Sequence, residues 1–252
     1  MAYVKTEEIQ DGIFEISFFH EAQNSLPTEI LNQLAWAVRD AGQNDAVKVI
    51  ILKSGGDRTF CAGASFTELI AIHDFDTGEK FFSGFAHVIN ALRTCGKIVI
   101  GRVQGKAIGG GVGLASAVDY CYATAQASIK LSELAVGIGP FVVGPAVERK
   151  VGLSAFSQLT LNATELYTAQ WAKEKGLYAD VFETIDAMDE AVLVLAQKLV
   201  NSNPEALRLL KKVFWQGTDH WDTLLIERAG MSGKLVLSDF TKKALAAFAV
   251  KA

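Results

Sequence analysis

The stretch GKAIGGGVGLASAVDY at residues 105–120 carries glycine at positions 105, 109, 110, 111 and 113, between an apolar run and a helical pattern of small residues. Its spacing does not fit a phosphate-binding P-loop, because three residues separate Gly101 from Gly105 and Lys106 is followed by alanine. It also lacks the third glycine of a dinucleotide-binding fingerprint. Two explanations remain at this point. The glycines allow close strand-to-helix packing, or they expose backbone amides at a helix start that form an oxyanion hole.

Strand and helix patterns alternate before this stretch. Residues 47–54 and 98–103 are short runs rich in β-branched side chains, and residues 77–92 between them repeat apolar side chains at helical spacing. A crossover of this length joins parallel strands and predicts a right-handed βαβ unit. A loop of small residues follows each strand: FCAGAS at 60–65 and the glycine stretch itself. Because ligands bind at the carboxyl ends of parallel strands, both loops are expected to border one pocket.

Helical patterns dominate the rest of the chain. An early helix is predicted at residues 27–41, and after residue 152 helix follows helix. The segment NATELYTAQWAKEKG at 162–176 predicts a helix that begins with a capping box from Asn162 to Glu165. Further helices are predicted at residues 188–200, 204–215 and 221–236. No flexible linker separates the two parts, so the prediction is one α/β domain with a helical extension.

Composition argues against several classes of protein. The chain has 252 residues, half of them apolar, and a formal net charge of −4 without a basic run, so no nucleic-acid partner is expected. Three cysteines without CxxC spacing and four widely separated histidines predict neither a disulfide framework nor a metal site. The longest weakly polar segment, 135–147, is broken by glycine and proline and is too short to span a membrane. Charges near the start leave no signal-peptide core, so the chain is expected to begin here and to be cytoplasmic.

Three motifs taken together are similar to those of one known family. FCAGAS at 60–65, the glycine stretch at 105–120 and LSELAVGIGPF at 131–141 resemble, in order and spacing, the enoyl-CoA hydratase/isomerase (crotonase) family. With NSL at 24–26, the resemblance covers essentially the whole chain.

This resemblance implies a fold and a kind of ligand. The fold is a crotonase-like ββα spiral, an α/β core at residues 1–190 that binds acyl-CoA. A helical C-terminal region at residues 191–252 would complete the pocket and the oligomer interface. The implied partners are an acyl-CoA thioester and identical subunits in a homotrimer or homohexamer. Coenzyme A is then part of the substrate, and no separate cofactor is expected.

The resemblance also assigns roles to individual residues. The amides of Ala64 and Gly110 correspond to the family's oxyanion hole, which holds the thioester carbonyl oxygen. Family loops that hold the CoA adenine and pantetheine match Ala22, Ala62 and Ala64. Other expected substrate-binding residues are Ser65, which stands where aspartate is common, Gly109, Gly111, Gly113 and Phe141.

The number of carboxylates bears on the reaction. Family hydratases use two glutamates; the second corresponds to Glu133, whereas the first falls on Gly113. Asp119 is a poor substitute, because six residues of helix place it roughly 9 Å farther along. A single base can still move a double bond from C3 to C2, by taking a proton from C2 and returning it at C4 while an oxyanion hole stabilises the dienolate. Apolar neighbours of Glu133 predict a raised carboxyl pKa, which suits such a proton shuttle.

The sequence therefore favours 3,2-enoyl-CoA isomerisation by Glu133. LSELAVGIGPF is also similar to its counterpart in the single-glutamate 3,2-enoyl-CoA isomerases. The second acid of dienoyl isomerases, which would fall near Phe141, has no counterpart here. Three alternatives remain open: hydration with one glutamate, decarboxylation or another lyase reaction, and acyl-CoA binding without catalysis.

Other charged or reactive side chains have simpler expected roles. Lys106 and Lys242 or Lys243 are candidates for contacts with CoA phosphates. Glu68 and Glu148 are expected to be solvated or ion-paired. The residues expected to pack rather than react are Cys61, Phe214, Trp215 and Trp221.

Overall fold

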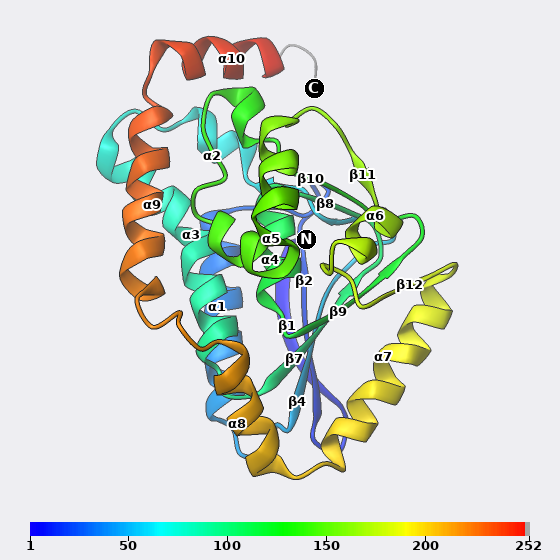
Figure 1. Cartoon of the computed structure of the whole chain (residues 1–252). Coiled ribbons are helices and arrows are strands. Elements are labelled where there is room, and N and C mark those ends of the chain that lie inside the picture. The colour runs from blue at the N-terminus through cyan, green and yellow to red at the C-terminus, as the bar shows by residue number, and fades with distance from the viewer. Residues whose placement is uncertain (250–252) are drawn as a thin grey trace.

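A six-stranded sheet runs through the centre of the molecule (Figure 1). The computed structural model describes residues 1–249. The sheet has the order β1-β2-β4-β7-β9-β12, in which β1 and β2 are antiparallel and all other neighbours are parallel. Its strands are β1 (Tyr3–Gln10), β2 (Ile13–Phe19), β4 (Val49–Ser54), β7 (Ile98–Val103), β9 (Tyr120–Thr124) and β12 (Asp180–Phe182).

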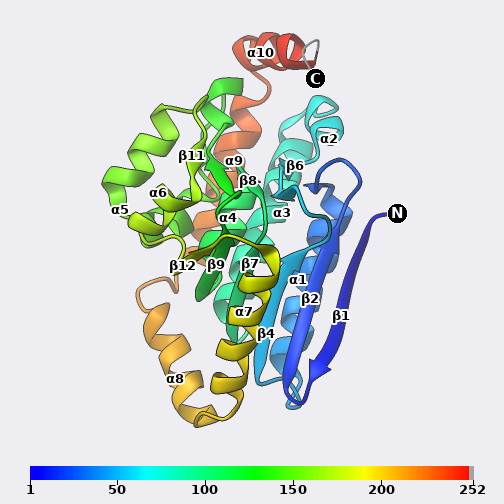
Figure 2. The same ribbon diagram turned by 90° about the vertical axis from the view of Figure 1, so that its right-hand side faces the viewer.

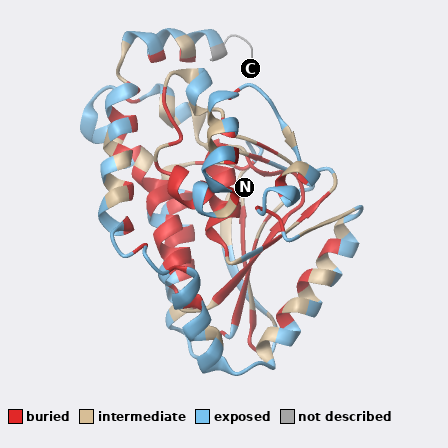
Figure 3. Ribbon diagram, in the orientation of Figure 1, coloured by how far each residue is buried: buried red, intermediate tan, exposed pale blue. Residues whose placement is uncertain are grey.

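Helices cover both faces of this sheet, as a second view shows (Figure 2). Helices α1 (Thr28–Gln43) and α3 (Phe75–Thr94) pack on one face, and α7 (Ile185–Val200) packs on the other. Strands β4 and β7 are buried along nearly their whole length, as parallel strands between helices are. They pair in parallel, with Ile51 opposite Ile100, so the predicted parallel pairing is confirmed. Buried residues accordingly gather along the sheet and the inner side of α3 (Figure 3).

Two smaller sheets carry the segments singled out in the sequence. The first has the order β11-β10-β8-β5, and the second pairs β3 with β6. Helix α4 (Gly110–Ala117) begins directly after β8, and the 3₁₀ helix η1 (Glu133–Val136) follows β10. These short strands therefore bring the three sequence motifs to one place. Their bounds are β3 (Ser25–Leu26), β5 (Thr59–Cys61), β6 (Gly63–Ala64), β8 (Lys106–Ile108), β10 (Ser128–Lys130) and β11 (Tyr167–Thr168).

The prediction that a helix begins at Asn162 with a capping box is wrong. Helix α5 (Gly144–Leu161) ends there, and Asn162 is its C-terminal cap. Tyr167 then pairs with β10, so the next helix, α6 (Ala169–Glu174), begins only after Thr168, whose hydroxyl accepts the Trp171 amide at 3.1 Å. Strand pairing thus overrides the local capping signal.

The remaining helical predictions agree with the structure to within about three residues at each end. They correspond to α1, α3, α7, α8 (Pro204–Phe214) and α9 (Trp221–Leu235). A last helix, α10 (Asp239–Ala249), follows, and residues 250–252 of the predicted extension lie outside the described residues. The predicted division at residue 190 falls within α7 and stays a prediction.

A buried ion pair attaches α8 to the sheet. The Lys211 ammonium lies 2.6 Å from Oδ2 of Asp119, which stands between α4 and β9. The Trp215 indole donates to Oδ1 at 2.8 Å, and the Val99 amide donates to Oδ2 at 2.8 Å. Trp215 also packs edge-on against Trp221, with ring centres 5.9 Å apart. The packing role expected for these tryptophans is confirmed, whereas the side chain of Phe214 on α8 is exposed.

Several further features concern the described chain as a whole. Between residues 1 and 249, no helix is both long and apolar enough to cross a membrane. In the same part of the chain, no three histidine, cysteine or acidic side chains gather as a metal site would require. The three cysteines are buried and free, as expected of reduced, packed thiols.

Candidate active site

The three motifs surround a cavity of about 830 Å³. It is bordered by the loop at residues 62–64, called the β6 loop below, by the start of α4, by η1 and by the phenylalanines of α3. Of the residues expected at the site, those in the lining are Ala22, Ala62, Ala64, Gly109, Gly110, Glu133 and Phe141. Larger apolar residues of the wall are Phe66, Leu69, Phe81, Phe82, Phe85, Ile108, Val136, Ile138, Val142 and Val143. The expectation that both small-residue loops border one pocket is confirmed.

Two glycines adopt backbone conformations that bring the loops together. Gly63 has a φ of +93° and Gly109 a φ of +54°, values that residues with a side chain rarely adopt. A Cβ added to Gly63 would lie 3.2 Å from the Ile108 carbonyl oxygen and 3.7 Å from the Gly110 nitrogen. The β6 loop therefore lies directly against the start of α4. The close-packing explanation of the glycines is confirmed, whereas the oxyanion-hole explanation stays a prediction.

Gly110 lies at the pocket end of α4. As the first residue of the helix, it has an amide with no intrahelical carbonyl partner. A Cβ at this position would lie 2.2 Å from Cζ of Phe85, so the ring packs on the bare Cα. At Gly111 a Cβ would come within 2.3 Å of the Cys61 carbonyl oxygen. Gly111 thus allows α4 to pack on β5 and does not line the pocket.

Ala64 is held by its neighbours on both sides. The Ser25 hydroxyl donates to the Ala64 carbonyl oxygen at 2.9 Å, and the Ser65 amide donates to the Leu26 carbonyl at 2.9 Å. The Ser65 hydroxyl caps α2 (Phe66–Ile70) and lies outside the pocket lining. Buried Asn24 braces the loop, because its side-chain amide donates to the carbonyls of Gly55 and Thr59 at 2.9 and 2.8 Å. The NSL segment thus fixes the backbone that carries Ala64.

Glu133 is the first residue of η1, and its carboxyl group lies against Gly109. A Cβ on Gly109 would be 3.0 Å from Oε1, so glycine is required to make room for the carboxyl. Oε2 is inaccessible to solvent and accepts no hydrogen bond from the described residues. Burial raises the pKa of Glu133 to about 7, partly opposed by a hydrogen bond from its own backbone. A buried carboxyl that has an unpartnered oxygen, on a residue that lines a cavity, is suited to exchange a proton with a ligand.

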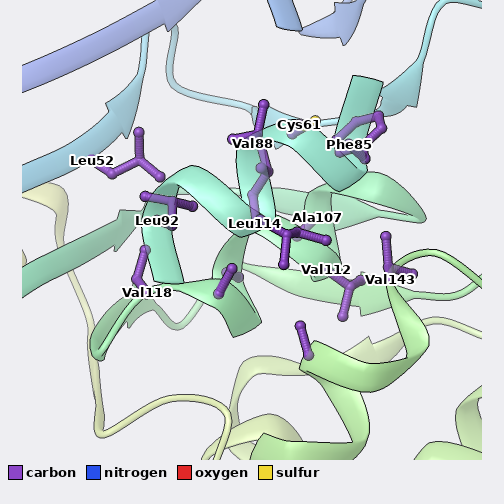
Figure 4. Close-up of a cluster of buried hydrophobic side chains, with 14 of the residues drawn as sticks. Leu52, Cys61, Phe85, Val88, Leu92, Ala107, Val112, Leu114, Val118 and Val143 are labelled. Carbon is purple, nitrogen blue, oxygen red and sulfur yellow. The ribbon is translucent and has the colours of Figure 1, made fainter. Parts of the chain in front are cut away.

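The position of the absent second glutamate is occupied by a neighbour. A Cβ on Gly113 would lie 2.5 Å from Cγ1 of Val143, the residue before α5. Val143 belongs to the buried cluster around α4 that also contains Phe85 and Leu114 (Figure 4). Gly113 itself is buried and does not line the pocket. The site therefore has no room for a longer side chain at position 113 unless Val143 changes too.

Other candidates from the sequence lie elsewhere. Glu68 accepts hydrogen bonds from the Thr28 amide and hydroxyl at 3.0 and 2.6 Å, and thereby caps α1. Glu148 and Lys106 are exposed and outside the pocket lining. Burial raises the pKa of Cys61 to about 12, which agrees with a packing role. Lys242 borders a separate cavity of about 250 Å³ between α2 and α10.

The structure adds pocket residues that sequence reasoning missed. Ser25 and Lys130 line the cavity, and Val143 shapes it. The role of Ser25 could have been found from the NSL segment, which contains it. Lys130 is not part of any motif, and its place in the pocket depends on the register of a three-residue strand.

Comparison with known proteins identifies the family of this chain. A model of the family described as enoyl-CoA hydratase/isomerase matches residues 8–252. The chain belongs to the enoyl-CoA hydratase/isomerase family. This family member is 29% identical over 233 residues to the short-chain-enoyl-CoA hydratase of Clostridium acetobutylicum, covering 92% of this chain and 88% of that one. It is 32% identical over 201 residues to the mitochondrial methylglutaconyl-CoA hydratase of Mus musculus, covering 78% of this chain and 63% of that protein, less than two thirds of its length.

A solved structure supports the fold of this family member. The crystal structure of enoyl-CoA hydratase from Bacillus halodurans superposes on this chain with a TM-score of 0.89. The match covers 97% of this chain and 99% of the Bacillus halodurans chain. At 22% sequence identity this likeness shows the fold, so the expected crotonase-like α/β core with C-terminal helices is confirmed. The protein is an enzyme of the enoyl-CoA hydratase/isomerase family, and an acyl-CoA thioester is the substrate that fits it.

Proposed function

We propose that this enzyme converts 3-enoyl-CoA into 2-enoyl-CoA thioesters, with Glu133 as the proton shuttle. One observation carries the proposal: of residues 1–249, Glu133 alone contributes a carboxyl group to the pocket lining. Addition of water is easiest with two carboxylates that orient the water and exchange protons with it. With Val143 packed against Gly113, no second acid lines this pocket among the described residues.

The mechanism follows from the arrangement of the backbone amides and Glu133. The thioester carbonyl oxygen accepts hydrogen bonds from the amides of Ala64 and Gly110, which stabilise the dienolate formed when C2 loses a proton. The Glu133 carboxylate takes this proton and returns it at C4, so the double bond moves without any change in composition. Coenzyme A enters as part of the substrate, and we propose no separate cofactor.

Hydration of 2-enoyl-CoA is the second candidate. It is supported by the names of the two relatives, both hydratases, at 29% and 32% identity. Glu133 alone would then have to orient the water and move both protons. The carboxylate count of the pocket favours isomerisation over this reaction.

Product analysis by mass spectrometry separates the two candidates. The purified enzyme is incubated separately with 3-hexenoyl-CoA and with 2-hexenoyl-CoA. We expect 3-hexenoyl-CoA to give a conjugated thioester of unchanged mass, and 2-hexenoyl-CoA to gain no water. A product with one added water, and no isomerisation of the 3-enoyl thioester, would show that hydration is the reaction.

The raised pKa of Glu133 predicts a pH profile. The base must be ionised in the free enzyme, and burial raises its pKa to about 7. Values of kcat/KM for 3-hexenoyl-CoA should therefore fall about tenfold for each pH unit below 7 and level off above it. Initial rates between pH 5.5 and 8.5 measure this, and a profile that stays level down to pH 5.5 would contradict the assignment.

Assembly into homotrimers or homohexamers is likewise a proposal. It is supported by exposed apolar side chains on one helix, α8, since such patches commonly mark interfaces. They are Leu209, Leu210, Val213 and Phe214.

A further inference from the structure

A cationic side chain, that of Lys130, lines the same pocket as Glu133. Among the lining residues that the structure describes, Lys130 is the only lysine, arginine or histidine. It is the last residue of β10, and its carbonyl oxygen accepts the Gly109 amide at 2.8 Å. The Lys130 backbone is therefore fixed beside the start of α4, where Gly110 presents its amide.

The strand register turns the Lys130 side chain toward the cavity. Strand β10 runs parallel to β8, with Lys130 opposite Ile108 and Ile129 opposite Ala107. Ile129 and Ala107 are both 0% exposed and belong to the main core, on one face of this small sheet. Because side chains alternate between the two faces, Lys130 and Ile108 share the other face, and both line the pocket.

The ammonium group of Lys130 has no partner among the residues that the structure describes. Within residues 1–249 it takes part in no hydrogen bond or ion pair. The Lys130 ammonium does not affect the ionisation of Glu133, because the pKa shift of that carboxyl is due to burial and a backbone hydrogen bond. A cation in a mostly apolar pocket, unused by the protein, is available for an anion that enters with the ligand.

We propose that Lys130 binds a carboxylate on the acyl chain, so that the preferred ligands are CoA thioesters of dicarboxylic acids. The inference rests on the proposed function in one respect, the placement of the thioester carbonyl at the Ala64 and Gly110 amides. CoA phosphates are the other anions of the ligand, but the pantetheine arm separates them from the thioester. A lysine whose backbone is bonded to Gly109 reaches groups near the thioester and not the far end of that arm.

The test compares binding of unreactive thioesters of equal chain length. Hexanoyl-CoA and adipoyl-CoA both carry six acyl carbons, and only adipoyl-CoA ends in a carboxylate; free CoA is the third ligand. Isothermal titration at pH 8 is expected to show adipoyl-CoA binding about tenfold more tightly than hexanoyl-CoA. Lys130→Met should abolish this preference while leaving the affinities for hexanoyl-CoA and CoA unchanged.

Two further variants serve as controls. Lys130→Arg should retain the preference because it keeps the positive charge, and Lys198→Met, at an exposed lysine of α7, should retain it because it lies outside the pocket. Equal affinity of the wild type for both thioesters overturns the proposal. An equal loss for all three ligands in Lys130→Met also overturns it, because the lysine would then contact CoA itself. Binding with the expected preference supports the proposal even where the isomerisation assay fails, whereas a wild type that binds none of the three disproves the acyl-CoA site.

Discussion

Glu133→Gln is expected to lower kcat for 3-hexenoyl-CoA by about 10³-fold, with KM little changed. The substitution keeps the size and shape of the side chain but removes the group that would carry a proton from C2 to C4. General acid–base catalysis by one residue is worth about 10² to 10⁴-fold, and here one residue serves both steps. The oxyanion-hole amides of Ala64 and Gly110 would remain, so substrate binding should persist. Steady-state rates with wild type and variant measure the effect.

The same variant is expected to be more stable than the wild type at high pH. The pKa of Glu133 is raised from 4.5 to about 7 in the folded protein, so the folded state disfavours the carboxylate. The stability that the protonated group contributes is complete below about pH 4.5 and is lost as pH rises through 7. At pH 8, Glu133→Gln should therefore raise the free energy of unfolding by up to about 3 kcal/mol, and the gain should vanish toward pH 4.5.

The effects of Glu133→Gln on turnover and on stability are tested against a control variant. Glu148→Gln, at an exposed glutamate on α5, should change neither turnover nor stability. Urea unfolding at pH 4.5 and pH 8 supplies the free energies. Wild-type turnover in Glu133→Gln would remove this residue from the mechanism, and an unchanged stability at pH 8 would show that its carboxyl is not strained by burial.

Much of the fold could be predicted because its main elements have strong local periodicity. The sequence predicts strand β7 at residues 98–103, the bounds that the structure shows, because a β-branched run between polar residues marks both ends. Helix α3 is predicted from the spacing of Phe81, Phe85 and Ile89, all three of which are buried. The helix start at Asn162 failed because two residues of β11 pair with β10, a contact that no local pattern contains.

The sequence predicts those parts of the candidate site that the glycine-rich backbone forms. It does not predict the parts that depend on contacts between segments far apart in the sequence. The family resemblance assigns the amide at Gly110, and the structure gives a physical reason for glycine there, because Phe85 packs on its bare Cα. Neither the occupation of the space beside Gly113 by Val143 nor the direction of the Lys130 side chain follows from spacing. Both depend on how segments distant in the sequence pack together.

The two buried carboxyl groups at Glu133 and Asp119 illustrate opposite uses of burial. Asp119 accepts hydrogen bonds from the Val99 amide, the Trp215 indole and the Lys211 ammonium, so both of its oxygens have partners. Glu133 has an oxygen without any partner in residues 1–249. Full pairing fixes a carboxylate in place and makes it structural, whereas an unpaired oxygen on a residue that lines the pocket leaves a group that can react. This contrast also explains why Asp119 cannot serve as the second acid.

Asp119→Ala should consequently destabilise the protein by about 3 to 5 kcal/mol and leave turnover per folded molecule unchanged. The Lys211 side chain is only 3% exposed, so the variant leaves its charge buried without a partner. Replacing both members, as Asp119→Leu with Lys211→Met, removes that charge and should recover most of the loss. Glu205→Ala, which breaks an exposed pair with Arg208 on the same helix, should cost less than about 1 kcal/mol. Urea unfolding of these variants measures each value; a loss in Asp119→Ala no larger than that in Glu205→Ala would mean that this ion pair does not hold α8 on the sheet.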